Sequence, residues 1–399
     1  RQPGLPRMLA SSLQNRAARA SRPARCAPAQ RVRGVLPPRV PRLANLSVRA
    51  SGEPLSVPED SQLAQLAKMT TLSIDTGDLS VIRRFAATGL ITDATTNPLF
   101  VSQAAMRGDE PEYADLVARA VAAAKEDLDG GPPTDGAIKL AMDYLSVFLG
   151  AKISEIVPGY VSTEVDVRLS FDATATCARA MRIIALYEAA GVDRSRILIK
   201  VAGTWPGINA ARGLARLGIK TNVTLVFGVC QAILSAQAGA TLISPFPGRV
   251  LEWTRKNVPD GPQTWSPADD PGVVSVRDMY AYLRKFGHDT ICMPASWRSS
   301  TGNDMLDEIR ALAGIDRMTI PPPLLEQLAE CREPLPRSLD PQSAAALCQS
   351  DGHEMGESEF KWALAMDAAA NDKLAEALRA FAGDTDRLVA ALHAHPGWN

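Results

Sequence analysis

From about residue 62 onward, short apolar runs alternate with longer amphipathic stretches, and this alternation constrains the fold more than any other feature of the chain. The apolar runs predict strands at 69–75, 90–95, 158–165, 196–202, 219–226, 240–245, 290–296 and 317–320. The stretches between them predict helices, for example at 111–127, 135–156, 172–190, 206–217, 228–238, 275–287, 303–313 and 322–331. Strands that alternate with helices are typical of a parallel sheet. The pattern therefore favours an α/β fold of the (β/α)8 TIM-barrel type, with a doubly wound sheet as the alternative.

The C-terminal part of the chain adds elements to this alternation. Residues 357–394 carry apolar side chains at helical spacing and predict two additional helices. Residues 332–356 are polar, contain proline and predict a loop. We therefore expect a single barrel domain over 62–395 that includes the C-terminal helices, with a linker at 51–61 and a separate arm before it.

The arm, residues 1–50, differs in composition from the rest of the chain. It contains 11 arginines and no aspartate, glutamate or lysine. It is rich in alanine and proline and lacks the long apolar core of a secretory signal, which is typical of an organellar transit peptide. We expect the plastid stroma (chloroplast) as the destination, with the mitochondrion as the alternative. The other interpretation is a disordered basic arm that binds an anionic partner.

The composition of the remaining residues argues against several classes of function. The whole chain has a net charge of −1, and because the arm contributes +11, the remainder carries −12. An acidic body argues against a nucleic-acid partner, and no apolar run approaches the roughly 20 residues that cross a membrane. Motifs for dinucleotides, nucleoside triphosphates and zinc are missing, so we predict neither a cofactor nor a metal. Six widely spaced cysteines predict reduced thiols rather than disulfides.

A single lysine, Lys200, interrupts the apolar run 197–202 (ILIKVA). Runs that are apolar on both faces are typical of parallel strands covered by helices. A buried ammonium is costly unless it is paired, and an uncharged lysine is a nucleophile that can form a Schiff base with a carbonyl. The alternative is a strand-end lysine that extends to solvent.

Polar side chains also fall near the C-terminal ends of other predicted strands. Side chains alternate faces along a strand, and the opposite parity at these ends is mostly apolar or small. In a closed barrel such polar residues converge at the C-terminal mouth, where barrel active sites lie. Taken singly, each of these polar residues could also belong to a turn, cap a helix or be an ordinary strand residue. The set consists of Asp75, Asn97 with Thr95, Glu164, Asn222 with Thr224, and Ser296 with Arg298.

The segment 244–249 (SPFPGR) combines groups that suit a phosphate. The Ser244 hydroxyl, the loop N–H groups and the Arg249 guanidinium can all donate to phosphate oxygens. Late βα-loops of barrels often hold phosphate, and Arg298 at the end of the next strand could supply a second guanidinium. The alternative is a strand-end turn with a surface arginine.

Several of these segments resemble transaldolases. They are 93–98 (DATTNP), 162–166 (STEVD), 197–200 (ILIK) with Thr204 and Trp205, 222–225 (NVTL), 243–246 (ISPF) with Gly248 and Arg249, 270–276 (DPGVVSV) and 357–360 (ESEF). The resemblance covers roughly 62–392. It implies a metal-free Schiff-base enzyme of the pentose phosphate pathway on a β/α barrel. Such an enzyme moves a dihydroxyacetone unit from sedoheptulose 7-phosphate to glyceraldehyde 3-phosphate, which yields erythrose 4-phosphate and fructose 6-phosphate.

The resemblance also implies a role for each candidate residue. Lys200 would form the Schiff base, and Asp75 would be the acid/base for the hydroxyl beside the scissile bond. Glu164, with Thr224, would hold a water that transfers protons. The other residues would contact the sugar phosphate: Asn97, Asn222 and Ser296 at the dihydroxyacetone unit, Arg249 and Arg298 at the phosphate, and Thr95, Ser244 and Phe246 along the substrate site. A homodimer is also expected from the family.

Other functions remain open at this point. A fructose 6-phosphate aldolase shares the lysine but releases free dihydroxyacetone. In that relative the position of Phe246 tends to be tyrosine and that of Glu164 glutamine, so both residues favour transfer. A non-catalytic sugar-phosphate-binding barrel is disfavoured by the complete set of Lys, Asp, Glu and Asn. A nucleic-acid binder that uses the basic arm predicts binding that disappears when residues 1–50 are removed.

Overall fold

A computed structural model describes residues 55–128, 133–258 and 260–398 of the chain. The expected transit peptide, residues 1–50, and the start of the expected linker lie outside the described residues, so both stay predictions. The described part begins with the last residues of the linker and continues through the predicted barrel domain.

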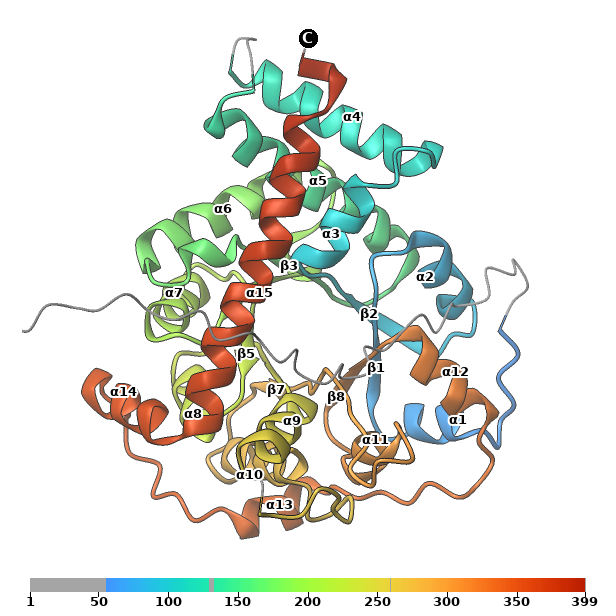
Figure 1. The fold of residues 1–399 in the computed structure, drawn as a ribbon, viewed down its shortest axis with the longest axis vertical. Coiled ribbons are helices and arrows are strands. Elements are labelled where there is room, and N and C mark those ends of the chain that lie inside the picture. Colours follow the sequence, from blue (N-terminus) through green and yellow to red (C-terminus); the bar gives the residue numbers. More distant parts are fainter. Residues whose placement is uncertain (1–54, 129–132, 259, 399) are drawn as a thin grey trace, which may run out of the picture. The chain divides into compact units, whose positions relative to one another are not determined.

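Eight parallel strands form a barrel whose sheet order is β7-β6-β5-β4-β3-β2-β1-β8 (Figure 1). The Thr319 N–H donates to the carbonyl of Pro294 over 3.2 Å and so joins the two ends of the sheet. Each predicted strand is confirmed, which settles the fold as a barrel rather than a doubly wound sheet. The strands are β1 (Thr71–Asp75), β2 (Ile91–Thr95), β3 (Val161–Glu164), β4 (Ile197–Ala202), β5 (Thr221–Val226), β6 (Leu242–Pro245), β7 (Ile291–Cys292) and β8 (Arg317–Ile320).

Helices surround the barrel, and those named from the sequence are all present. The tenth helix begins four residues before its predicted start, because the Asp270 side chain caps it and Pro271 fits its first turn. The eleventh is shorter than predicted, and the predicted loop contains a short thirteenth helix. The helices are α1 (Gln62–Ala67), α2 (Leu79–Ala86), α3 (Pro98–Ala105), α4 (Pro111–Glu126), α5 (Asp135–Ile156), α6 (Ala173–Ala189), α7 (Trp205–Arg216), α8 (Val229–Gln237), α9 (Pro247–Asn257), α10 (Pro271–Lys285), α11 (Asp307–Ala311), α12 (Pro322–Glu330), α13 (Pro341–Leu347), α14 (Glu357–Met366) and α15 (Ala368–His393).

The register of the central strands positions the polar residues that the sequence singled out. Every residue of β4 and of β5 is buried, as expected for strands covered on both faces. Glu164 on β3 pairs with Lys200 on β4, and Lys200 pairs with Asn222 on β5. Three polar residues therefore stand at paired positions on neighbouring strands.

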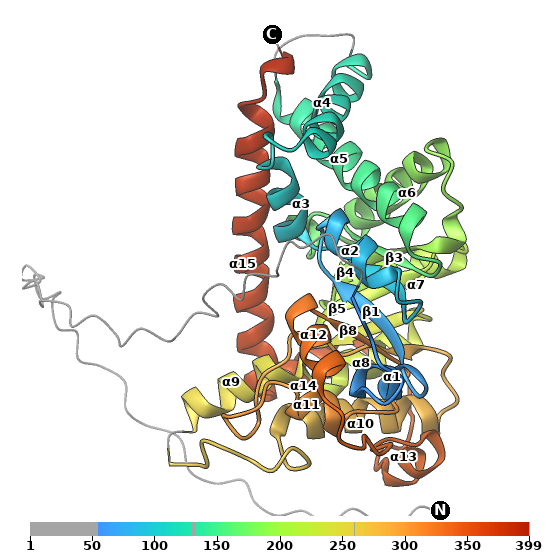
Figure 2. The ribbon, with the colours of Figure 1, turned by 90° about the vertical axis from the view of Figure 1, so that its right-hand side faces the viewer.

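The two predicted C-terminal helices are α14 and α15, and α15 covers one end of the barrel (Figures 1 and 2). Its buried side chains pack against residues that follow the ends of β5 and β6. Ala370, Leu374, Ala377 and Phe381 form one apolar cluster with Phe227 and Phe246. The helix therefore acts as a roof over the ends of these strands.

Three further findings concern the described residues only. None of their helices is both long and apolar enough to cross a membrane. No group of three or more His, Cys, Asp or Glu among them is arranged to hold a metal ion. The five cysteines in this part of the chain are free thiols.

A close approach of two outer helices supports the strand that carries Glu164. Tyr187 of α6 is fully buried, and its hydroxyl lies 2.5 Å from the Thr163 hydroxyl on β3. The ring reaches this position because Gly150 of α5 has no side chain, and a Cβ there would collide with the Tyr187 hydroxyl. Gly150 thus allows the contact that holds the residue beside Glu164.

Gly150→Ala should therefore destabilise the fold. Overpacking of this kind costs about 1–3 kcal/mol in free energy of unfolding, which urea denaturation can measure. Gly136→Ala in the same helix is the matched control, because a Cβ there meets only the Thr134 hydroxyl at 3.6 Å. That control should be neutral or stabilising by up to about 1 kcal/mol. Equal effects of the two substitutions would contradict the packing argument.

Candidate active site

A cavity of about 740 Å³, measured to its open mouth, lies at the C-terminal ends of the strands. Residues from six strands, from the segments after β2, β6 and β7, and from α3, α9 and α15 line it. It brings together most of the side chains that the sequence analysis selected. These are Asp75, Thr95, Asn97, Lys200, Thr224, Ser244, Phe246, Arg249 and Ser296.

Lys200 occupies the floor of this cavity and has two defined contacts. Its Nζ lies 3.4 Å from Oε2 of Glu164 and donates to the carbonyl of Thr96 over 3.1 Å. The Lys200 and Glu164 side chains are only 7% and 4% exposed. The alternative interpretation of the sequence, in which the lysine side chain extends to solvent, is therefore wrong. That Lys200 reacts as an uncharged amine stays a prediction.

Burial changes the acidity of Glu164. It raises the pKa of this carboxyl from 4.5 to about 7, and the neighbouring Lys200 opposes the rise. Near neutral pH the group can therefore both accept and donate a proton, which general acid–base catalysis requires. Oε2 of Glu164 and the Thr224 hydroxyl are also buried and have no hydrogen-bond partner among the described residues. The Thr224 hydroxyl is therefore available to a substrate or a water, whereas Oε2 of Glu164 is already engaged in the ion pair with Lys200.

Asp75 stands at the end of β1 in a short chain of hydroxyl groups. The Thr95 hydroxyl donates to Oδ1 of Asp75 over 2.7 Å and lies 2.8 Å from the Thr319 hydroxyl. Burial raises the pKa of Asp75, whereas Lys200, the Thr95 hydroxyl and Arg249 oppose the rise. A carboxylate with a raised pKa is a stronger base, and Thr95 fixes its orientation.

Asn222 does not line the cavity but lies beneath it. Its Oδ1 accepts from the Ser244 hydroxyl over 2.9 Å, and its Nδ2 donates to the Ser162 hydroxyl over 3.2 Å. Asn222 is fully buried, whereas Ser244 faces the cavity. The predicted contact between Asn222 and substrate stays a prediction. In the structure the Asn222 side chain positions Ser244 through their hydrogen bond.

Arg249 in the first turn of α9 is the arginine that lines the cavity. Its guanidinium lies over the Phe246 ring, 5.2 Å from the ring centroid, and its Nε donates to the Ser296 hydroxyl over 3.4 Å. Burial and the charge of Arg298 lower the pKa of Arg249. Ser296 adopts the left-handed region with φ +65°, which is uncommon for a serine. That strained backbone aims the hydroxyl at the guanidinium.

Arg298, the second predicted phosphate ligand, is held away from the cavity. Its Nε donates to Glu252 over 2.6 Å, and its Nη1 donates to the carbonyl of Trp297 over 2.8 Å. Arg298 is not among the residues that line the cavity. It can reach a phosphate there only by leaving Glu252.

The sequence analysis missed three polar or aromatic residues of the cavity. Thr319 comes from β8, and Phe381 and Asp384 come from α15. Thr319 has the alternation signal of the other strand-end residues and could have been found by it. Phe381 and Asp384 lie 181 and 184 residues after Lys200 in a helix whose position over the mouth no local pattern reveals.

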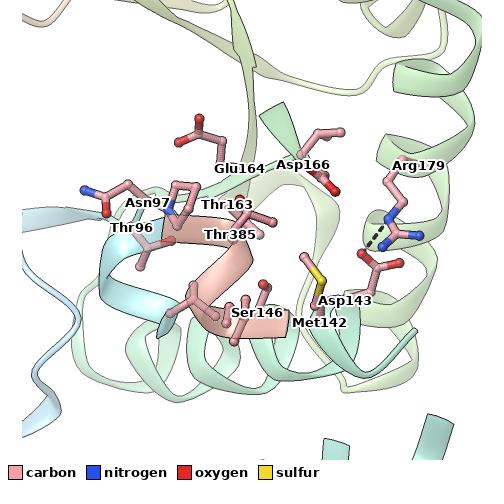
Figure 3. Close-up of a pocket in the computed structure, with 14 residues that line it drawn as sticks. Thr96, Asn97, Met142, Asp143, Ser146, Thr163, Glu164, Asp166, Arg179 and Thr385 are labelled. Atoms are coloured by element: carbon pink, nitrogen blue, oxygen red, sulfur yellow. Dashed lines mark ion pairs between the residues drawn. The ribbon is translucent and has the colours of Figure 1, made fainter. Parts of the chain in front are cut away.

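A second, smaller cavity of about 450 Å³ has Asn97 and Glu164 among its lining residues (Figure 3). Asn97 and Glu164 stand on one side of it, and Asp143 and Arg179 stand on the other. The Arg179 Nε lies 2.7 Å from Oδ1 of Asp143, and burial raises the pKa of Asp143 to about 7 against the opposing charge of Arg179. Asn97 lines both cavities, whereas Glu164 lines only this second one and meets the larger cavity through Lys200.

Comparison with known proteins matches this chain to one family. The family model described as transaldolase/fructose-6-phosphate aldolase matches residues 72–392. A transaldolase of Alteromonas mediterranea is 45% identical over 332 residues, which cover 83% of this chain and 98% of that protein. A transaldolase of Nostoc sp. is 44% identical over 330 residues, which cover 83% of this chain and 95% of the relative. A transaldolase of Thermosynechococcus vestitus is 43% identical over 333 residues, which cover 84% of this chain and 81% of that protein.

The raised pKa of Glu164 predicts a pH-dependent stability. Between about pH 4.5 and 7 the folded state keeps a proton that the unfolded state has released, so this contribution is complete below pH 4.5 and is lost as pH rises through 7. Glu164→Gln stays neutral and should escape this loss. From pH 5 to pH 8 its free energy of unfolding should rise relative to the unmodified chain by about 2–3 kcal/mol, measured by urea denaturation.

The exposed Glu155 of α5 provides the control for this experiment. Glu155→Gln removes the same group from the surface and should follow the unmodified chain at each pH. If the free energy of unfolding of the Glu164→Gln variant and of the unmodified chain changed equally with pH, the raised pKa of the buried Glu164 would be contradicted.

Proposed function

Because this chain belongs to the transaldolase/fructose-6-phosphate aldolase family, we propose a complete assignment of its active site for the transaldolase reaction. The protein is a transaldolase, an enzyme of the transferase class, and its substrates are sugar phosphates. The observation that carries the assignment is the buried Lys200, which faces the cavity beside the carboxylate of Glu164.

The first step joins the sugar to the enzyme. The Nζ of Lys200, as an uncharged amine, adds to the ketose carbonyl. The carbonyl oxygen then leaves as water with two protons, one from the amine and one from Glu164, transferred through a water held with Thr224. The product is an iminium between Lys200 and the sugar. The 3.4 Å separation of Nζ and Oε2 leaves the carboxyl within reach of the reacting centre.

Cleavage follows because the iminium withdraws electrons from the neighbouring C–C bond. Asp75 takes the proton of the hydroxyl beside that bond, the bond breaks, and its electron pair forms an enamine on the lysine. The aldose phosphate leaves as an aldehyde. The second aldehyde then reacts in the reverse direction, and Asp75 returns the proton to the new hydroxyl. Thr95 orients the carboxylate throughout.

Transfer rather than release requires that the enamine is not protonated while it waits. Phe246 and Phe381 line the cavity, and the roof helix α15 restricts access to water. Phe246 carries no hydroxyl that could deliver a proton. These features support transfer over the fructose 6-phosphate aldolase reaction.

The remaining cavity residues would bind the substrate. Asn97, Ser296 and Ser244 (supported by Asn222) would hold the dihydroxyacetone unit, and Arg249 would hold the phosphate. Arg298 would join it on leaving Glu252. With these contacts we assign fructose 6-phosphate and sedoheptulose 7-phosphate as donors, and erythrose 4-phosphate and glyceraldehyde 3-phosphate as acceptors.

We further propose that the enzyme is a homodimer without a nucleic-acid partner and that residues 1–50 direct it to the plastid stroma. The arginine-rich, acid-free composition of the arm supports targeting, and the net charge of −12 of the remainder disfavours nucleic acid. Fusion of residues 1–50 to a fluorescent protein tests the targeting, and mitochondrial or cytosolic fluorescence would contradict it. Sedimentation analysis tests the dimer, and a monomer at micromolar concentration would contradict it.

A product assay tests the proposed reaction. With fructose 6-phosphate as donor, the enzyme should form sedoheptulose 7-phosphate when erythrose 4-phosphate is present, and little free dihydroxyacetone when it is absent. Lys200→Met should abolish turnover because it keeps the side-chain length but removes the amine. Lys220→Met is the control, because Lys220 donates to Tyr160 and Ser195, away from the cavity. Rapid release of dihydroxyacetone would instead indicate an aldolase, and no conversion would indicate a binding protein.

Substitution of the two arginines tests the phosphate site. Arg249→Lys should raise the KM for fructose 6-phosphate about tenfold, because a lysine cannot replace the planar fork of the guanidinium. Arg298→Lys should raise KM less, because Arg298 must first leave Glu252. Steady-state kinetics at fixed ionic strength measure both values. An unchanged KM for Arg249→Lys would refute the phosphate assignment.

A further inference from the structure

The roof helix α15 places a carboxylate, Asp384, in the wall of a cavity that must accept an anion. Its side chain is 11% exposed and lines the cavity together with Arg249. The partner that the structure gives it is Arg387, one turn along the same helix, whose side chain is 54% exposed. A buried negative charge beside a phosphate site opposes phosphate binding, so its presence there requires an explanation.

The charges around Arg249 explain why a buried carboxylate lies in this cavity. Arg249 is a buried cation with a second cation, Arg298, nearby, and Asp384 is one of the carboxylates whose charge stabilises its protonated form. In turn burial raises the pKa of Asp384, and the charges of Arg387 and Arg249 oppose this rise. Asp384 is thus shared between an exposed arginine at the mouth and the buried arginine that would hold the phosphate.

We propose that Asp384 is a specificity-determining residue: its carboxylate offsets the charge of Arg249 and so limits how tightly the cavity holds a phosphate group. This inference rests on the proposed function, in which Arg249 binds the phosphate. Each turnover must release one phosphosugar and admit another at the same site. Binding that is equally strong for substrates and transition state lowers KM without raising kcat. An Arg249 whose charge is partly offset by Asp384 therefore supports turnover better than an Arg249 without a nearby carboxylate.

The same carboxylate also acts on the acid–base group. Asp384 raises the pKa of Glu164, as a like charge does, although burial is the larger cause and Lys200 opposes both. Charged groups from several elements face this region. Lys200 and Asp166 act on Glu164, Arg387 and Arg249 act on Asp384, and Arg298, Glu252 and Glu376 also act on Arg249. Removal of the Asp384 charge should therefore lower the pKa of Glu164 and shift the part of the pH–rate profile that Glu164 controls to lower pH.

The test measures the binding of inorganic phosphate to the full chain by isothermal titration at low, fixed ionic strength. Asp384→Asn keeps the shape of the side chain but removes its charge, and should tighten phosphate binding about three- to tenfold. Asp386→Asn is the matched control. It removes the same charge from the same helix at a side chain that is 70% exposed and pairs with Arg168, so phosphate affinity should stay unchanged.

Arg387→Gln provides an independent test, because it should change the affinity for phosphate in the opposite direction. Arg387 is more than half exposed, so its loss leaves the packing of α15 intact, and the freed charge of Asp384 should weaken phosphate binding. In the Asp384→Asn background the same substitution should have little effect. Equal weakening in both backgrounds would overturn the view that Arg387 acts through Asp384.

Two further readouts separate this role from a purely structural one. In the Asp384→Asn variant the KM for fructose 6-phosphate should fall more than kcat changes, and the limb of the pH–rate profile that the Glu164 proton donor sets should shift to lower pH. Unchanged phosphate affinity in this variant, or an equal change in Asp386→Asn, would overturn the proposal while leaving the proposed function intact. If the unmodified chain bound no phosphate, the assignment of Arg249 would fail as well.

Discussion

The side-by-side burial of Lys200 and Glu164 is the interaction on which the rest of the site depends. Removing either charge from water is costly, and neither side chain would be stable alone in an apolar layer. The parallel register of β3 and β4 places them opposite each other, and closure of the barrel keeps solvent from their inner face. The pair therefore exists only in the folded barrel, and burial that would otherwise destabilise the chain gives Glu164 a pKa of about 7.

The roof helix α15 completes the environment that this pair requires. Its apolar face packs on Phe246 and Phe227 and so narrows the mouth above the strands. Phe381 supplies a water-excluding surface, and Asp384 supplies a charge that Arg249 and Arg387 share. One helix near the end of the chain thus influences both the lifetime of an enamine and the affinity for phosphate.

Local sequence patterns predicted the barrel and its floor but not its roof. Apolar runs located every strand, because strands covered on both faces must be apolar, and their alternation placed Lys200 and Asp75 at the mouth. Patterns of this kind do not show which surface a helix covers, so Phe381 and Asp384 were missed. Nor do they show competition between charges, so the bond from Arg298 to Glu252 was not foreseen. Elements read from the sequence as turns or loops, or left unassigned, include α1, α2, α3, α9 and α13.

The position of the covalent bond between enzyme and sugar tests the central claim most directly. Borohydride reduction in the presence of fructose 6-phosphate, followed by proteolysis and mass spectrometry, locates it. The account predicts a three-carbon adduct on the peptide that contains Lys200 and on no other. A trapped sugar on a different lysine, or no adduct in a preparation that turns over, would contradict it.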